Sequence, residues 1–404
     1  MRLTSLYAEN FKCYKSPVNI NLKKFNIVIG KNSAGKSAFL SLIPFVIFNT
    51  SKDANDEINL NPYDMDLGSN YADIIHGHNQ MTPLTVGATF ETKTKKISFL
   101  TKIMYFIEID RMLATEFTLK VNNEIMYKAS LALDRPLNKN IAFYQDEVSH
   151  SVSQVKFKGL MPKKTYSSDS NIIISMIRKY NFNLSYLGPF REIVKRTYTK
   201  KKSNQLNIGY KGENAPFLLQ SYYNEKKLSD AIKDWMKSNL GGKYYVIKDL
   251  DKAFSIHCND DYKSVNLIDE GMGLTQIFPS VVNRKLRDFA YINGIEIIEQ
   301  PELHMHPAAA GAISDLYFEA TSNIENTIFI ETHSKEILLR ARRRIAEGKF
   351  KGDDMNIIFI DTGNAKTPIK EIKVNDKGMV SYWPQGIFEE AIQEVIALSE
   401  AVIK

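Results

Sequence analysis

Hydrophobic and polar residues follow two different periods along this 404-residue chain. Alternating apolar and polar positions predict a pair of strands over 3–22 and a longer antiparallel β subdomain from Pro83 to about Lys158. Helical periodicity then predicts helix over 216–240, and a strand pattern returns over 244–268. From Gly273 onward, predicted helices alternate with short apolar runs at 295–298, 327–330 and 355–360. This alternation is typical of a parallel α/β core.

These patterns divide the chain into three expected parts. An N-terminal lobe spans 1–165, a helical and β insertion spans 166–265, and a C-terminal lobe spans 266–404. Composition is that of a globular protein, since 44% of the residues are hydrophobic and 25% are charged. The net charge of +7 permits an acidic or nucleic-acid partner without requiring one.

Cysteine content and hydropathy narrow the class of protein further. Cys13 and Cys258 are the only cysteines, which excludes a disulfide framework and a thiolate zinc site. Residues 1–15 lack the apolar stretch of a signal peptide, and the longest apolar run, at 42–48, is far short of a membrane span. We therefore expect a cytoplasmic protein without a membrane partner.

A phosphate-binding loop is the strongest chemical signal. The strand-like run FNIVI at 25–29 leads into GKNSAGKS at 30–37 and then into an apolar helical stretch, which is the context that this loop requires. Main-chain N–H groups of such a loop converge on phosphate oxygens, and the helix dipole adds positive potential. Lys36 is expected to neutralise β- and γ-phosphate charge, and Ser37 to bind Mg²⁺. The predicted nucleotide contacts are Gly30, Lys31, Asn32, Ser33, Ala34, Gly35, Lys36 and Ser37.

Three later motifs carry matching chemistry. In IEIIEQPELHMHP, an apolar strand ends at Glu299, whose carboxylate can hold the Mg²⁺ that Ser37 also binds. In DEGMGLTQ, Gly271 and Gly273 flank Met272 just before a helix, so this segment can receive a phosphate. In IFIETHS, a strand delivers His333 to the carboxyl edge of the sheet, where open α/β sheets bind ligands.

The order of these motifs resembles that of the ATP-binding-cassette (ABC) ATPases. Over essentially the whole chain, the sequence is similar to the stand-alone branch related to RecF, SMC and the overcoming-lysogenisation-defect (OLD) ATPases, which includes ATPase subunits of phage-defence systems such as PARIS. The segments that carry this resemblance are NFKCYK, NIVIGKNSAGKSAFL, DLGSNYADIIHGHN, SYLGPFRE, NIGYKGENAP, DEGMGLTQIFP, IEQPELHMHP, ETHSKEILLR and YWPQGIFEEAI.

The resemblance implies a P-loop ATPase head with an antiparallel β lobe and an inserted helical and β region. Two heads would sandwich ATP, with the phosphate loop of one facing Gly271–Gly273 of the other. Glu299 would then bind Mg²⁺ and His333 would sense the γ-phosphate. A homodimer or larger homo-oligomer is therefore expected to be needed for hydrolysis.

The chain departs from the ABC pattern at two positions. Gln300 stands where the catalytic glutamate is usual, and a carboxamide orients water but is no general base, so turnover is expected to be slow. Glu302 either supplies the missing carboxylate or is a solvated loop residue. His306 occupies the place of the D-loop aspartate.

Other polar clusters have more than one interpretation. His304 and His306, like His76 and His78, form a metal pair or, as we favour, belong to turns; the residue that acts as the glutamine-loop contact is not assigned. The basic stretch at 191–202 is a solvated loop or a DNA contact, and Arg191 itself reaches a phosphate, a partner subunit or a surface carboxylate.

Features that the chain lacks lead to three hypotheses about function. It has no heptad runs for SMC-type arms, and the 71 residues after His333 are too few for an OLD-type nuclease domain. We therefore predict an ATPase that senses a signal and controls a separate effector, a nuclease or toxin encoded nearby, in antiviral defence. The alternatives are a RecF-like repair ATPase that clamps DNA and an ATP-gated scaffold with little turnover.

Overall fold

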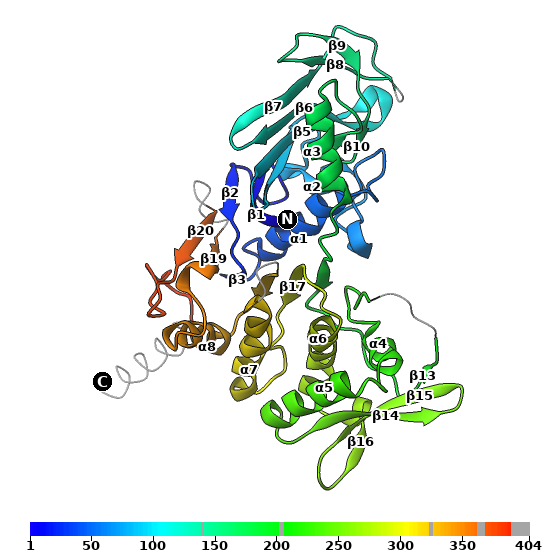
Figure 1. Ribbon diagram of the computed structural model, residues 1–404, viewed down its shortest axis with the longest axis vertical. Helices are drawn as coiled ribbons and strands as arrows, with labels where there is room; N and C mark the ends of the chain where they lie inside the picture. The colour runs from blue at the N-terminus through cyan, green and yellow to red at the C-terminus, as the bar shows by residue number, and fades with distance from the viewer. Residues whose placement is uncertain (139–140, 202–205, 323–325, 362–367, 389–404) are drawn as a thin grey trace, which may run out of the picture. The chain divides into compact units, whose positions relative to one another are not determined.

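The computed structural model describes residues 1–138, 141–201, 206–322, 326–361 and 368–388, which form two compact units (Figure 1). The first unit contains residues 1–22, 32–182 and 360–370. The second contains residues 23–31 and 183–359 and continues from Glu371.

An eight-stranded antiparallel sheet organises the first unit, in the order β2-β1-β4-β5-β6-β7-β8-β9. It confirms the predicted antiparallel β subdomain and shows that the strands over 3–22 belong to the same sheet. The strands are β1 (Arg2–Glu9), β2 (Val18–Asn21), β4 (Leu84–Glu91), β5 (Lys96–Phe106), β6 (Arg111–Val121), β7 (Glu124–Leu131), β8 (Phe143–Asp146) and β9 (Val152–Gln154).

Side chains on one face of this sheet are buried, as its alternating pattern requires. In β5, Ile97, Phe99 and Ile103 are buried between more exposed neighbours. Helix α1 (Lys36–Thr50) is apolar on nearly all sides, and almost all of its residues are buried. The unit also contains the short helix α2 (Tyr71–Ile74), the hairpin of β10 (Phe157–Lys158) and β11 (Met161–Pro162), and helix α3 (Ser168–Lys179), which the sequence pattern did not predict.

A six-stranded sheet in the order β12-β17-β18-β3-β19-β20 forms the centre of the second unit. The pairs β12–β17, β17–β18 and β18–β3 are parallel, which confirms the predicted parallel α/β core. Five of these strands are buried along their whole length, as is usual for parallel strands inside an α/β core. The strands are β12 (Ser185–Leu187), β17 (Ile295–Glu299), β18 (Thr327–Glu331), β3 (Phe25–Gly30), β19 (Met355–Ile360) and β20 (Ile369–Lys373).

Helices and a second, smaller sheet complete the second unit. Helices α6 (Met272–Phe289), α7 (Pro307–Phe318) and α8 (Lys335–Ala346) confirm the predicted alternation with strands. The helical stretch predicted over 216–240 is two helices, α4 (Ala215–Ser221) and α5 (Lys226–Asn239). They pack with α6 into the same core as a small sheet of β13 (Tyr198–Thr199), β14 (Tyr244–Leu250), β15 (Ala253–Asn259) and β16 (Ser264–Asn266).

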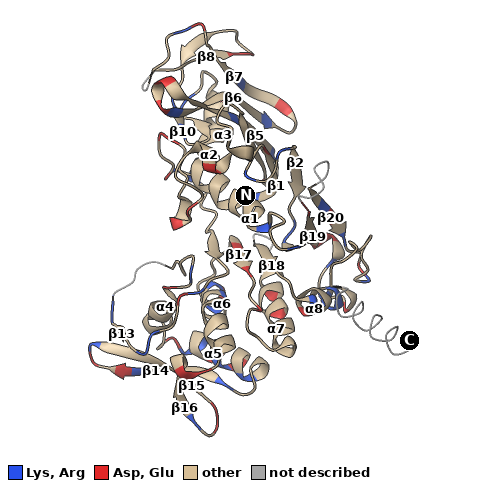
Figure 2. Ribbon diagram, turned by 180° about the vertical axis from the view of Figure 1, so that it is seen from behind, with Lys and Arg blue, Asp and Glu red and all other residues tan. Residues whose placement is uncertain are grey.

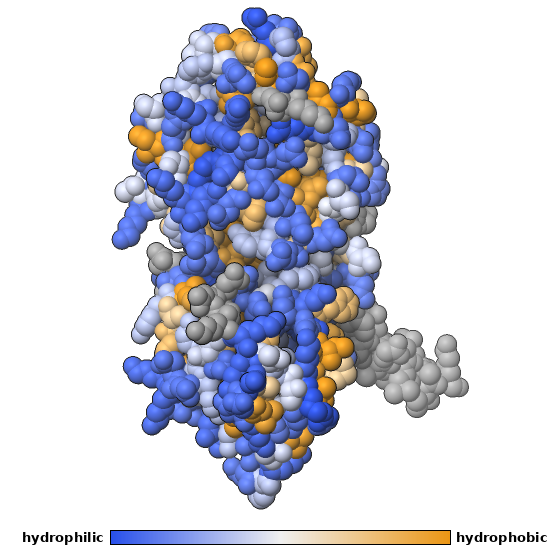
Figure 3. Space-filling view, turned by 90° about the vertical axis from the view of Figure 1, so that its right-hand side faces the viewer, coloured by the Kyte–Doolittle hydropathy of each residue, from blue (hydrophilic) through white to orange (hydrophobic). Residues whose placement is uncertain are grey.

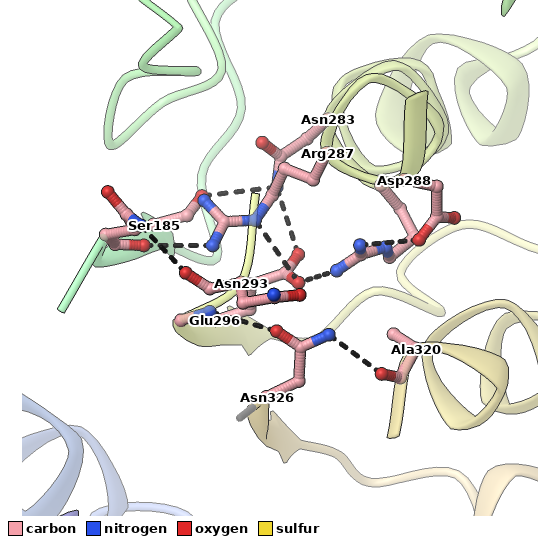
Figure 4. Close-up of polar contacts among 11 residues, drawn as sticks. Ser185, Asn283, Arg287, Asp288, Asn293, Glu296, Ala320 and Asn326 are labelled. Atoms are coloured by element: carbon pink, nitrogen blue, oxygen red, sulfur yellow. Dashed lines mark hydrogen bonds and ion pairs between the residues drawn. The ribbon is translucent and has the colours of Figure 1, made fainter. Parts of the chain in front are cut away.

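A buried ionic cluster joins α6 to β17 (Figure 4). Glu296 of β17 is fully buried and forms ion pairs with Arg284 and with Arg287, whose Nε lies 3.4 Å from Glu296 Oε1. Asn283 Nδ2 lies 3.4 Å from Glu296 Oε2 and 3.1 Å from Ser185 Oγ of β12. Burial lowers the pKa of Arg287 to about 9, and the nearby charge of Arg284 acts in the same direction. These contacts fix the long helix that starts at Met272 to the strand that ends at Glu299.

Hydropathy varies among the helices and across one face of the molecule. No helix in the described part of the chain is long and apolar enough to cross a membrane. On the face seen in Figure 3, hydrophobic side chains form separate patches among hydrophilic ones. Figure 2 shows basic and acidic residues intermixed on both units.

Candidate functional site

The phosphate loop has the backbone that its glycines allow. Gly30 has φ 155° and Gly35 has φ 95°, and Ser33 between them is also left-handed, with φ 60°. Helix α1 then starts at Lys36, with Gly35 as its N-terminal neighbour, and the hydroxyl of Tyr14 donates to the Gly35 carbonyl over 2.8 Å. The first turn of α1 has no acidic residue and no side-chain cap. The positive end of a 15-residue helix is thus combined with the buried Lys36, an arrangement that favours an anion.

The predicted residues of the second unit meet at one edge of its sheet. Glu299, the last residue of β17, pairs with Glu331, the last residue of β18, and Glu331 pairs with Val28 of β3. Thr332 N donates to Val28 O over 3.2 Å. Parallel register therefore places the ends of three strands together: Glu299, the start of the loop at Gly30–Lys31, and the segment that leads to His333.

Glu299 is held from a neighbouring strand. It is 1% exposed, and the Tyr186 hydroxyl of β12 donates to Glu299 Oε1 over 2.7 Å. Burial raises the pKa of Tyr186 well above its ordinary value, and the Glu299 charge adds to that shift, so Tyr186 stays a donor. Arg191 Nη2 donates to the Glu299 main-chain carbonyl over 2.9 Å. Sequence reasoning did not assign a role to Tyr186, whose strand is three residues long. The segment SYLGPFRE, which contains Tyr186, supported only the family resemblance.

A tight turn follows Glu299. Gln300 has φ 45° and His304 has φ 62°, a conformation that side-chain-bearing residues adopt at a cost of about 1–3 kcal/mol. Gln300 N donates to Glu331 O over 2.8 Å, Leu303 N donates to Gln300 O, and Met305 N donates to Glu302 O. The turn is therefore well defined next to the Glu299 carboxylate.

Glu302 turns inward, which contradicts the solvated-loop interpretation. Its Oε1 accepts from Thr332 Oγ1 over 2.7 Å and from His333 N over 2.8 Å. Burial raises the pKa of Glu302, and these hydrogen bonds oppose the shift. His333 Nε2 lies 3.7 Å from Glu331 Oε1, and the imidazole is 40% exposed. One carboxylate thus links the segment after β17 to the segment after β18.

The glycine segment before α6 lies against the same turn. A Cβ on Gly273 would be 2.8 Å from His304 O, so close approach of main chain requires glycine here. A Cβ on Gly271 would meet nothing within 4 Å, and Met272 is 58% exposed. Gly271 provides no side-chain cap, which leaves the start of α6 suited to an external anion.

The histidines of the two predicted pairs make local contacts. His306 caps α7 by accepting from Ala308 N, and His76 and His78 bond main-chain carbonyls through Nδ1. Within the described ranges, no group of three or more His, Cys, Asp or Glu side chains is arranged to hold a metal ion.

Many residues of the basic stretch at 191–202, and of a second basic stretch at 340–344, form ion pairs within the chain. Arg196 forms a bidentate pair with Asp269, and Lys200 bonds both oxygens of Asp249. In the stretch at 340–344, Arg340 and Arg344 share Asp315. These pairs reduce the positive charge that the two stretches offer to a phosphate backbone.

Strand order, register and phosphate loop together define an ABC-type P-loop NTPase. Residues 1–338 match the AAA ATPase domain family, and the chain belongs to that family. Among solved structures, the chain is similar to an Smc head bound to the C-winged helix domain of ScpA, with TM-score 0.54 and 11% identity, covering 94% of this chain and 100% of that one.

A second similar structure is the Smc head domain with an extended coiled coil bound to the C-terminal domain of ScpA derived from Pyrococcus furiosus. Its TM-score is 0.51 at 11% identity, with 100% of both chains covered. At these identities the likeness shows the fold alone. A comparison with curated proteins finds no match.

Proposed function

We propose that this protein binds ATP and Mg²⁺, hydrolyses ATP slowly at a site completed by a second copy of the chain, and controls a separate effector in antiviral defence. The observation that carries the ATPase proposal is the shared sheet edge of β3, β18 and β17, where Gly30, Glu299 and the segment leading to His333 come together.

The residues present suit a magnesium nucleotide. Hydroxyl and carboxylate oxygens, as in Ser37 and Glu299, are the hard ligands that Mg²⁺ prefers, and the cation would neutralise phosphate charge. Lys36 and the main-chain N–H groups of 30–37 would hold the β- and γ-phosphates. Gly271–Gly273 would meet the γ-phosphate of the nucleotide held by the other copy, and His333 would contact it within the same copy.

Two residues divide the task of the usual catalytic glutamate. The Gln300 carboxamide would orient the attacking water but cannot accept its proton. Glu302 is an inward carboxylate whose pKa is raised by burial, which makes it a stronger proton acceptor than an exposed carboxylate. Since Glu302 Oε1 already accepts two hydrogen bonds, this acceptor is constrained, and slow turnover follows.

Restoring the usual carboxylate should accelerate hydrolysis. We expect Gln300→Glu to raise kcat by about 10- to 100-fold, because a positioned general base contributes roughly 10²- to 10⁴-fold. Steady-state phosphate release with saturating ATP checks this, with Glu302→Gln as the companion variant. A kcat that stays unchanged in Gln300→Glu would show that position 300 does not face the water.

Completion of the site by a second copy makes turnover depend on concentration. We expect kcat per subunit to rise with protein concentration until dimers form, and to become constant above that range. The test is phosphate release across a dilution series, with sedimentation at the same concentrations. Turnover per subunit that is independent of dilution while the protein sediments as a monomer would contradict the composite site.

The proposed partner is a separate effector protein encoded nearby. The two Smc heads that resemble this fold were solved bound to domains of ScpA, and by analogy a nucleotide-dependent surface of this chain would bind its effector. Co-purification with the product of the adjacent gene, with and without ATP, tests this proposal. A RecF-like DNA clamp is less favoured because Arg196, Lys200, Arg340 and Arg344 are paired within the chain.

Gln300 also supports a second candidate, an ATP-locked scaffold that releases nucleotide by exchange or after a trigger. The two candidates differ in basal rate. Turnover by the protein alone on the order of 1 s⁻¹ or faster, an ordinary enzymatic rate, would exclude the scaffold.

A further inference from the structure

Arg191 is buried at the edge of the nucleotide half-site that the second unit provides. It follows the Gly188–Pro189 turn after β12 and is 8% exposed. Gly188 N donates to Tyr210 O and Glu192 N donates to Lys211 O, both over 2.8 Å. These two bonds hold the segment against 210–211 and direct Arg191 inward, away from a surface carboxylate or a partner.

Arg191 contacts the peptide group that follows the candidate magnesium ligand Glu299. Its Nη2 donates over 2.9 Å to the carbonyl of Glu299, and the N–H of the same peptide group, that of Gln300, donates over 2.8 Å to Glu331 O. Both polar atoms of the Glu299–Gln300 peptide are therefore held. Because the peptide is planar, its orientation sets the direction in which the left-handed Gln300 leaves the strand.

Stability alone does not account for a guanidinium here. Arg191 Nε and Nη1 are buried without a hydrogen-bond partner among the described residues. Burial lowers the pKa of Arg191 to about 10, opposed by the nearby Tyr317 and Glu299, so the group remains charged and incompletely solvated at neutral pH. A buried charge with unsatisfied donors is costly, and an apolar side chain of similar volume is often as stable or more stable.

We propose that Arg191 is a positioning residue for ATP hydrolysis: it fixes the Glu299–Gln300 peptide so that the magnesium carboxylate and the water-orienting amide keep their relative placement. This inference rests on the proposed ATPase function. It predicts an effect on the chemical step and little effect on nucleotide affinity, since in this role Arg191 acts on the Glu299–Gln300 peptide and not on the nucleotide.

Arg191→Met tests the inference, because it keeps the volume and removes the donors. We expect kcat to fall about 10- to 100-fold, as for loss of groups that orient metal ligands. The dissociation constant of a fluorescent ATP analogue should change less than about threefold, and the melting temperature should stay level or rise. In Arg191→Ala, added guanidinium ion at millimolar concentration should restore part of kcat, which a purely structural role would not produce.

Arg178→Met is the matched control in the first unit. Arg178 Nη2 also donates to main-chain carbonyls, those of Lys158 and Met161, and burial lowers its pKa to about 10 as well. Its loss should lower the melting temperature and leave kcat of the folded protein unchanged.

Three results would overturn the positioning role and leave the ATPase proposal standing. They are an unchanged kcat in Arg191→Met, a loss of kcat equal to that of Arg178→Met, or no effect of guanidinium on Arg191→Ala. Absence of turnover by the parent protein over the whole concentration series would instead overturn the ATPase proposal, and this inference with it.

Discussion

Lys36→Ala should reduce ATP turnover at least about 100-fold, the scale of loss when one donor to developing charge is removed. Lys36 is 6% exposed at the first position of α1, where its charge opposes the positive end of the helix dipole. The first turn of α1 has no acidic residue, so a phosphate bound there would meet both the Lys36 ammonium and the positive end of the helix dipole.

The loss of Lys36 should also change how nucleotide affects stability. With ATP and Mg²⁺, we expect the melting temperature of the parent to rise and that of Lys36→Ala to stay near its value without nucleotide, because ligand that does not bind does not stabilise the folded state. Differential scanning fluorimetry with and without ATP measures both effects.

Lys31→Ala is the matched control, since it removes a lysine from the same loop. Lys31 is exposed, and alanine retains its main-chain N–H. We expect a change in turnover of about fivefold at most, as for a weak surface charge. Equal losses in Lys36→Ala and Lys31→Ala would contradict the specific role of Lys36.

Local sequence patterns predicted the parts of this fold that depend on local physics. The phosphate loop follows from two glycines in φ-positive conformations between a strand and a helix, and each feature is visible in the residues at 25–48. Strand and helix alternation after Gly273 predicted the parallel sheet, and pairing in register then brought Glu299 and the strand before His333 to one edge. The roles of these residues in catalysis remain predictions.

Contacts between segments distant in sequence could not be predicted in this way. Tyr186 bonds Glu299 from a strand of three residues, too short to leave a periodic signal. The sequence left the direction of the Glu302 side chain undecided, because that direction depends on hydrogen bonds donated by Thr332 and His333, some 30 residues away. The helix at 168–179 was missed although a local signal exists, since its buried residues Ser170, Ile173, Ile174 and Ile177 recur at helical spacing after the N-cap Ser167.

Charged residues inside an apolar strand show most clearly what the sequence pattern could not predict. IEIIE at 295–299 contains two buried glutamates, and the strand pattern treats them alike. Glu299 lies at the carboxyl end of the strand with the candidate site, whereas Glu296 faces Arg284 and Arg287 of α6. The sequence alone assigned only the first, because a role for the second depends on which helix packs against it.

Glu296→Ala should destabilise the protein by about 3–5 kcal/mol, the usual cost of leaving a buried charge without its partner. Arg284 and Arg287 are 1% and 4% exposed, so water cannot replace the carboxylate. Asn283 Nδ2, which also donates to Ser185 Oγ, would lose Glu296 as an acceptor. Urea unfolding followed by tryptophan fluorescence measures the loss as a lower transition midpoint. Glu347→Ala is the control, because Glu347 pairs with Arg344 at the surface, where water can replace the lost partner, so the transition midpoint should move much less.

Replacing the whole cluster separates the energetics of charge from those of packing. Combining Glu296→Leu with Arg284→Met and Arg287→Met removes all three buried charges and retains side-chain volume. We expect this triple variant to recover most of the stability lost in Glu296→Ala, because a buried ion cluster is on average no more stabilising than a well-packed apolar one. A triple variant as unstable as Glu296→Ala would mean that the geometry of the cluster, and not its charge balance, holds α6 against β17. The start of α6 carries Gly271–Gly273, so that outcome would also predict a loss of turnover in the triple variant, measurable in the same preparation.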